Sequence, residues 1–186
     1  MNLKKKIVIS MFVILLGIIV ILSGCASIQI GAPKVTKALA VITPIGESGV
    51  RGVVTFIQEK NAVRIVTELS GLTPGKHGFH IHEFGDRSSP DGMSAGGHFN
   101  PKNTAHGDPY EKESHAGDLG NIEADRSGKA TYNRLNFNIS LTGPNSIIGR
   151  SVVIKEKPDD LKTQPGGGAG ARIAWGVIGL ASQPVE

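Results

Sequence analysis

The feature that most restricts the fold is a succession of eight short β-prone segments, separated by glycine and proline, with no stretch of sustained helical apolar period. The segments are residues 38–42, 51–58, 62–69, 78–84, 119–124, 129–139, 151–157 and 172–178. In the third segment, Val63, Ile65 and Leu69 alternate with outward positions, which is the pattern of a half-buried strand. Eight such strands indicate an antiparallel sandwich or barrel.

A long loop interrupts this pattern between residues 85 and 117, where no secondary structure is evident. The 25 glycines and the 5% aromatic content of the chain agree with a loop-rich β protein. Long loops in compact domains are usually functional. With 186 residues, the chain is long enough for one domain plus attachments.

The first 24 residues have the features of a targeting segment. Three lysines at positions 4–6 precede an apolar run over residues 7–22, and Leu22, Ser23 and Gly24 lead directly to Cys25. This resembles a bacterial lipoprotein signal peptide, in which the cysteine becomes the lipidated N-terminus. The alternative is a permanent transmembrane anchor, but the run is short of the ~20 residues that a spanning helix needs.

The predicted organisation is therefore a signal peptide (1–24), a lipidated N-terminus and tether (25–37) and a β domain (38–186). We expect the mature chain to be held at the extracytoplasmic face of the cell membrane through Cys25. Removing residues 1–24 removes three lysines and no acids, which lowers the formal net charge from +4 to +1. No basic run with interleaved aromatic residues remains, so a nucleic-acid partner is not expected.

All six histidines lie between positions 77 and 115, and their spacing predicts a metal site. His80 and His82 alternate with apolar residues in one predicted strand and therefore share a face. The histidines at 98, 106 and 115 are followed by Asp118, and three imidazoles with one carboxylate form a closed tetrahedral zinc site. Because the chain has one cysteine, an internal disulfide and every multi-cysteine metal site are excluded.

Several motifs together resemble the copper–zinc superoxide dismutase family. They are residues 78–86 (GFHIHEFGD), 94–101 (SAGGHFNP), 115–121 (HAGDLGN), 148–153 (IGRSVV) and 170–179 (GARIAWGVIG). The resemblance runs in order from about Ala38 to Ala181. It implies an eight-stranded Greek-key β-barrel with long metal-binding loops, superoxide as the substrate, and one zinc and one copper per chain.

The resemblance also implies a role for each site residue. The copper ligands would be His80, His82 and His98, and the zinc ligands would be His98, His106, His115 and Asp118, so that His98 bridges the metals. Asp159 matches a carboxylate that hydrogen-bonds one ligand of each metal, and Arg172 matches the arginine that attracts superoxide beside copper. His77 matches a histidine that packs without binding metal. The family contains monomers and homodimers, and both are expected possibilities here.

The chain departs from the family pattern at two places. Lys155 stands where the fourth copper ligand should be, and a protonated lysine has no lone pair for a metal. The family's disulfide is also absent, since Trp175 replaces one cysteine and residues 91–93 replace the surroundings of the other. The zinc half of the predicted site is complete, and the copper half lacks one ligand.

Two functional hypotheses follow. The first is a membrane-tethered superoxide dismutase whose activity is impaired by Lys155. The second is a non-enzymatic, zinc-stabilised metal-binding or interaction module of the same fold. The intact Arg172, Asp159 and histidines favour the enzyme. A zinc hydrolase would need an open zinc position, and the four-ligand set argues against it.

Overall fold

The computed structural model describes residues 35–111 and 113–182. The predicted signal peptide, Cys25 and most of the predicted tether lie outside these residues. Within them there are nine strands and one short 3-10 helix, Met93–Ala95. The strands are β1 Lys37–Pro44, β2 Arg51–Gln58, β3 Val63–Ser70, β4 Gly75–His82, β5 Asp118–Ala124, β6 Ala130–Asn136, β7 Ser151–Lys155, β8 Arg172–Val177 and β9 Gly179–Leu180.

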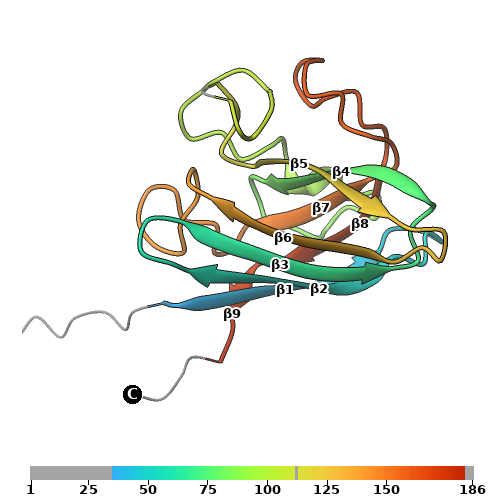
Figure 1. Ribbon diagram of the computed structural model, residues 1–186, viewed down its shortest axis with the longest axis horizontal. Helices are drawn as coiled ribbons and strands as arrows, with labels where there is room; N and C mark the ends of the chain where they lie inside the picture. Colours follow the sequence, from blue (N-terminus) through green and yellow to red (C-terminus); the bar gives the residue numbers. More distant parts are fainter. Residues whose placement is uncertain (1–34, 112, 183–186) are drawn as a thin grey trace, which may run out of the picture. The chain divides into compact units, whose positions relative to one another are not determined.

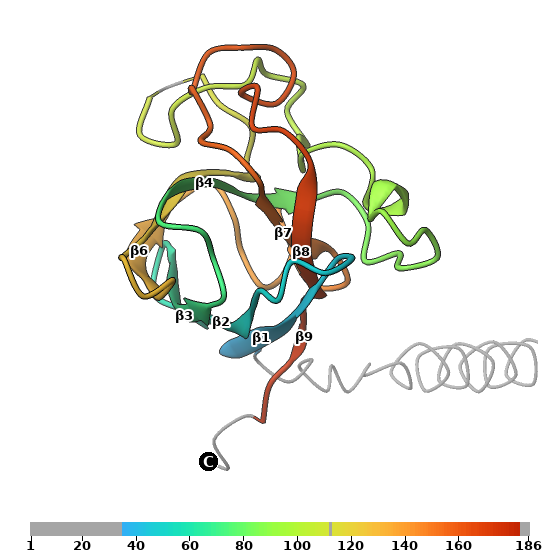
Figure 2. The ribbon, with the colours of Figure 1, turned by 90° about the vertical axis from the view of Figure 1, so that its right-hand side faces the viewer.

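The strands form a closed antiparallel barrel (Figures 1 and 2). The hydrogen-bonded order is β2-β3-β6-β5-β4-β7-β8-β1, and β1 pairs again with β2 to close it. The two-residue strand β9 follows β8 along the chain and pairs with Ala38 and Leu39 of β1. The order β3-β6-β5-β4 places sequence-distant strands side by side, which is a Greek-key connection. The predicted eight-stranded barrel is therefore confirmed, with one additional strand.

Side-chain alternation accounts for the core. Val63, Ile65 and Leu69 of β3 point inward and are buried, as the sequence pattern predicts. Phe79 and Ile81 of β4 are fully buried in the same apolar cluster. Successive residues of a strand point to opposite faces, so His80 and His82 project from the outer face of β4. The barrel core thus fixes the direction in which these two imidazoles point.

Two long loops cover this outer face along one side of the barrel (Figure 2). One joins β4 to β5 and the other joins β7 to β8, and both views show them above the barrel (Figures 1 and 2). Hydrogen bonds tie the loops together, because the side chain of Gln164 bonds both the backbone N–H and the carbonyl of His106 at 2.9 Å. The predicted long loop is present over residues 83–117 and contains the 3-10 helix Met93–Ala95.

No helix among residues 35–111 and 113–182 is long and apolar enough to cross a membrane.

Candidate metal centre

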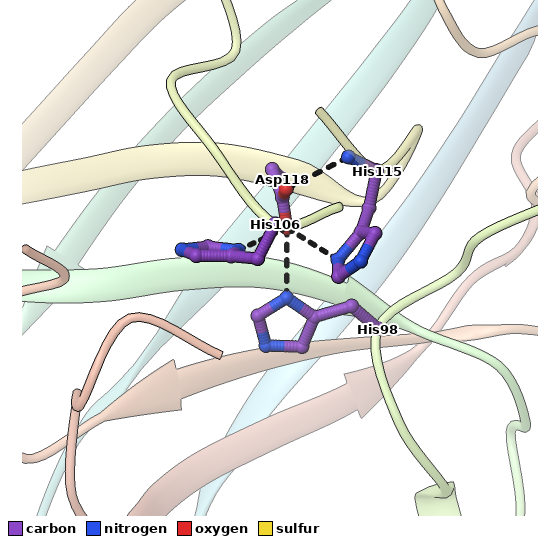
Figure 3. Close-up of side chains that lie close together, drawn as sticks. All are labelled: His98, His106, His115 and Asp118. Atoms are coloured by element: carbon purple, nitrogen blue, oxygen red, sulfur yellow. Dashed lines mark hydrogen bonds and ion pairs between the residues drawn. The ribbon is translucent and has the colours of Figure 1, made fainter. Parts of the chain in front are cut away.

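The first of two ligand clusters gathers around Asp118, the first residue of β5 (Figure 3). Its Oδ1 lies 2.7 Å from His98 Nδ1, 3.1 Å from His106 Nδ1 and 3.2 Å from His115 Nδ1. Its Oδ2 accepts backbone hydrogen bonds from His115 at 2.8 Å and Gly107 at 3.2 Å, which fix the carboxylate. All four potential ligand atoms lie within 4.8 Å of one another. The structure thus brings together the four residues predicted as zinc ligands.

The electrostatics of this cluster favour an ionised carboxylate. Burial by itself would raise the pKa of Asp118, but hydrogen bonds from His106, His115 and His98 outweigh burial and hold the pKa far below its ordinary value. Three imidazoles and a carboxylate are suitable ligands for zinc, and together they fill a tetrahedral coordination shell. The arrangement leaves no position for a substrate on such an ion.

The second cluster consists of His80, His82 and His98, whose potential ligand atoms also lie within 4.8 Å of one another. The Nε2 atom of His80 hydrogen-bonds Asp159 Oδ2 at 2.7 Å, and the Nδ1 atom of His82 hydrogen-bonds the Gly96 carbonyl at 2.9 Å. The remaining nitrogens, His80 Nδ1 and His82 Nε2, are buried and have no hydrogen-bond partner among the residues that the structure describes. Buried polar atoms are rarely left unpaired, so these two nitrogens fit a metal ion.

Burial keeps these rings neutral, which a metal ligand requires. It lowers the pKa of His80 to about 4 and that of His82 well below its ordinary value. The ring centroid of His98 lies 4.0 Å from that of His80 and 5.0 Å from that of His82. Because His98 also faces Asp118 through Nδ1, it belongs to both clusters.

Asp159, in the loop after β7, connects the two clusters. Its Oδ2 bonds His80 as described, and its Oδ1 lies 2.9 Å from His106 Nε2. Asn121 of β5 holds the aspartate in place, because its side chain bonds both the backbone N–H and the carbonyl of Asp159. Burial opposes protonation of His106, but hydrogen bonds to Asp118 and Asp159 raise its pKa to about 9. Asp159 thus hydrogen-bonds one histidine of each cluster.

Arg172 and Lys155 lie beside the second cluster. Together with His82 and His98 they line a pocket of about 620 Å³. The guanidinium of Arg172 donates hydrogen bonds to the carbonyls of Gly92 and Gly96, the latter at 2.6 Å. Lys155 ends β7, follows a bulge in the β7–β8 ladder and is half-buried. Lys155 therefore lines the pocket next to His82 and His98 of the second cluster.

His77 belongs to neither cluster. It is buried, its Nδ1 lies 2.9 Å from the Lys155 carbonyl, and its Nε2 lies 2.9 Å from the Thr73 carbonyl. The ring thereby joins the end of β7 to the turn before β4, which is a packing role.

Sequence reasoning missed Gln164, Asn121 and Gly96, each of which positions a site residue. Their partners are 58, 38 and 14 residues away along the chain, respectively. Gly96 and Asn121 lie within the motifs quoted for the family resemblance, but the sequence does not indicate these contacts, because each partner is distant along the chain.

A β-barrel with two histidine clusters that share one imidazole defines a class of metalloprotein that could hold two ions side by side. The family model for copper/zinc superoxide dismutase matches residues 50–178. The extracellular copper–zinc superoxide dismutase of Brugia pahangi is 42% identical over 158 residues, which cover 80% of this chain and 78% of the relative. The chain belongs to the copper/zinc superoxide dismutase family, as the motifs predict.

A solved structure supports the same conclusion for the fold. The crystal structure of a protein described as the clock protein EA4 matches with a TM-score of 0.76 and 40% identity, over 83% of this chain and 100% of that one. The family implies copper and zinc as cofactors, and the two histidine clusters are places where such ions could bind.

Proposed function

We propose that this protein is a superoxide dismutase that acts outside the cytoplasm and converts superoxide to oxygen and hydrogen peroxide. One observation carries the proposal. The unpartnered nitrogens of His80 and His82 lie beside the shared imidazole of His98, next to a pocket that contains Arg172. Ligands for a second metal and a group that attracts a small anion thus occur in one place.

Each residue has a distinct role in the proposal. His98, His106, His115 and Asp118 hold zinc, and His80, His82 and His98 hold copper. Copper would supply the one-electron redox chemistry that dismutation requires. Asp159 fixes the ring orientation of His80 and His106, since it bonds the far nitrogen of each. Arg172 attracts the superoxide anion and orients it at the pocket.

Lys155 is the residue that would impair the enzyme. It lines the pocket where a fourth imidazole would complete the copper ligands. Two cationic side chains near a cupric ion lower its affinity by Coulomb repulsion. The same observation favours a second candidate function, a non-enzymatic module that binds zinc alone.

Metal analysis separates the two candidates. The full chain is purified in detergent, loaded with zinc and copper, and assayed for bound metal and for superoxide consumption. One copper per chain with activity above that of free copper supports the dismutase. One zinc, no copper and no activity would establish the zinc module instead. A Lys155→His variant that gains copper and activity would show that the lysine is the cause of the impairment.

The location rests on the N-terminal segment. A lipidated Cys25 would hold the protein on the outer side of the membrane, and the relative from Brugia pahangi is named an extracellular enzyme. A Cys25→Ser variant should leave the membrane fraction, whereas the unmodified chain should remain in it. Equal membrane retention of both chains would contradict lipid anchoring and favour a transmembrane anchor.

A further inference from the structure

The four residues of the first cluster (Figure 3) differ in how their backbones are held. Asp118 begins β5, and His98 forms a bridge with His82 at the end of β4. The His115 carbonyl accepts the N–H of Asp118 at 3.2 Å. The backbone of His106, by contrast, forms no hydrogen bond with any backbone group that the structure describes. The main chain of this one ligand therefore depends on side chains for its position.

Gln164, in the loop between β7 and β8, holds the main chain of His106. Its Oε1 atom accepts the His106 N–H at 2.9 Å, and its Nε2 atom donates to the His106 carbonyl at 2.9 Å. A residue in an antiparallel strand exchanges the same two bonds with the residue opposite it. The glutamine side chain thus supplies the backbone pairing that the other three ligands obtain from the barrel or from each other.

A compact turn presents Gln164 in this position. The Asp160 N–H donates to the Gly167 carbonyl at 2.9 Å, and the Gly167 N–H donates to the Thr163 carbonyl at 2.7 Å. The Oδ1 atom of Asp160 accepts the Thr163 N–H at 2.8 Å, which closes the turn from within. The Nε2 atom of Gln164 also donates to the Lys162 carbonyl at 3.1 Å. The glutamine amide is therefore oriented by its own loop.

The same loop holds the His106 ring. Asp159 Oδ1 lies 2.9 Å from Nε2 of the ring, and Nδ1 of the ring lies 3.1 Å from Asp118 Oδ1. A Cβ built on Gly167 would lie 2.8 Å from His106 Nε2 and would overlap Asp159 Oδ1, so the loop packs directly on the imidazole. Asp159 therefore sets the orientation of the ring, and Gln164 sets the position of the backbone that carries it.

We propose that Gln164 is a positioning residue of the zinc centre, which keeps His106 in the ligand set and so slows the release of zinc. A closed tetrahedral site requires all four donors at once. Without the two hydrogen bonds from Gln164, the loop that carries His106 can move away while His98, His115 and Asp118 stay in place. An ion held by three ligands has an open position and exchanges more readily. The inference rests on the proposed zinc binding of the first cluster but not on copper or on activity.

The test uses the full chain in detergent, free of copper and loaded with one zinc per chain, and follows zinc transfer to an excess of a chromogenic chelator. Gln164→Met keeps the length of the side chain but removes both hydrogen bonds. It should release zinc about tenfold faster, since residues that support metal ligands commonly contribute about 10–100-fold to metal affinity. Gln58→Met is the matched control, because Gln58 bonds the Ala62 carbonyl and the Leu141 N–H, outside both clusters. It should release zinc at the unmodified rate.

A double-mutant cycle shows whether Gln164 acts through His106. In a His106→Ala background, which lacks the ring, Gln164→Met should change the rate of zinc release by less than about twofold. Backbone amide exchange gives a second readout. The His106 N–H should exchange faster in Gln164→Met than in the unmodified chain, and at the unmodified rate in Gln58→Met. Because Gln164 is exposed, its substitution should leave the barrel folded.

Equal zinc release from the unmodified chain and from Gln164→Met would overturn the proposal. A tenfold effect of Gln164→Met that persists in the His106→Ala background would overturn it as well. An unmodified chain that binds no zinc would refute the proposed zinc centre itself, and this inference with it. Normal zinc binding with equal release rates would refute only the role of Gln164. Loss of superoxide consumption alone would leave the result unaffected, because copper is absent throughout.

Discussion

Trp175 is expected to stabilise the long loop that other members of the family attach with a disulfide. It lies on β8, is 4% exposed, and packs with Val153 of β7 and Ala95 of the 3-10 helix on the outside of the barrel. The Arg87 guanidinium covers its ring at 4.9 Å from the centroid. The ring is therefore enclosed between the sheet and the loop over residues 85–97.

The loss of stability expected for Trp175→Ala follows from this burial. Truncating a buried tryptophan to alanine costs about 3–5 kcal/mol, and we expect the lower end because the covering loop can partly collapse into the space. Loss of the contact with Arg87 adds up to about 1 kcal/mol. For a folded unit of roughly 150 residues, each kcal/mol lowers Tm by about 2–4 °C. Trp175→Ala should therefore unfold roughly 10 °C lower.

Thermal unfolding by circular dichroism measures this change. Both proteins are saturated with zinc at the same free concentration, so that metal linkage affects them equally. Phe137→Ala is the matched control, because Phe137 is aromatic but 71% exposed, and its Tm should change by less than about 2 °C. Trypsin should also cleave the Trp175→Ala chain faster after Arg87. A Tm within 2 °C of the unmodified chain, with no faster cleavage, would refute this account of Trp175.

Three further predictions concern the metal centre. Asp159→Asn should weaken zinc binding about 10–100-fold in a chelator competition. Removing zinc should expose the loop to trypsin after Lys102, and readdition should restore protection. In the metal-free chain, burial lowers the pKa of His80 to about 4, so urea stability should fall as pH drops from about 6.5 to 4. The hydrogen bonds that outweigh burial raise the pKa of His106 to about 9, so its contribution is complete below about pH 6.5 and lost towards pH 9. A stability that rises steadily from pH 4 to 9 would contradict these two assignments.

The strands could be predicted because the sequence features that mark each strand lie within it or at its ends. Alternation of apolar residues and bounding glycines place all eight barrel strands, and the differences are confined to their ends. β4 begins at Gly75 rather than at residue 78, because Gly75 and Lys76 pair with Ala124 and Glu123 of β5. Neither residue carries an alternating apolar side chain, so the sequence has no signal for this extension.

In the metal centre, too, some residues could be identified from local sequence and others could not. The first cluster was predictable from spacing because its members lie within one loop and at the start of the next strand. Asp159 and Arg172 come from a different loop and strand, so spacing could not assign them, and only the resemblance to the family did. The hydrogen bonds between Gln164 and His106 are indicated neither by spacing nor by the family resemblance, because they depend on how two loops meet.

Gly92 connects the two departures from the family pattern. It has φ of 76°, and a Cβ built there would lie 2.9 Å from Ile45 Cδ1, 3.4 Å from Arg172 Cδ and 3.7 Å from Trp175 Cε3. Its carbonyl accepts the hydrogen bond from Arg172. The packing of Trp175 therefore positions an acceptor that orients the cation opposite Lys155. Because the two residues act through one glycine, Trp175→Ala and Arg172→Gln should lower the superoxide consumption of the zinc- and copper-loaded chain non-additively, with the second substitution having less effect once the first is present.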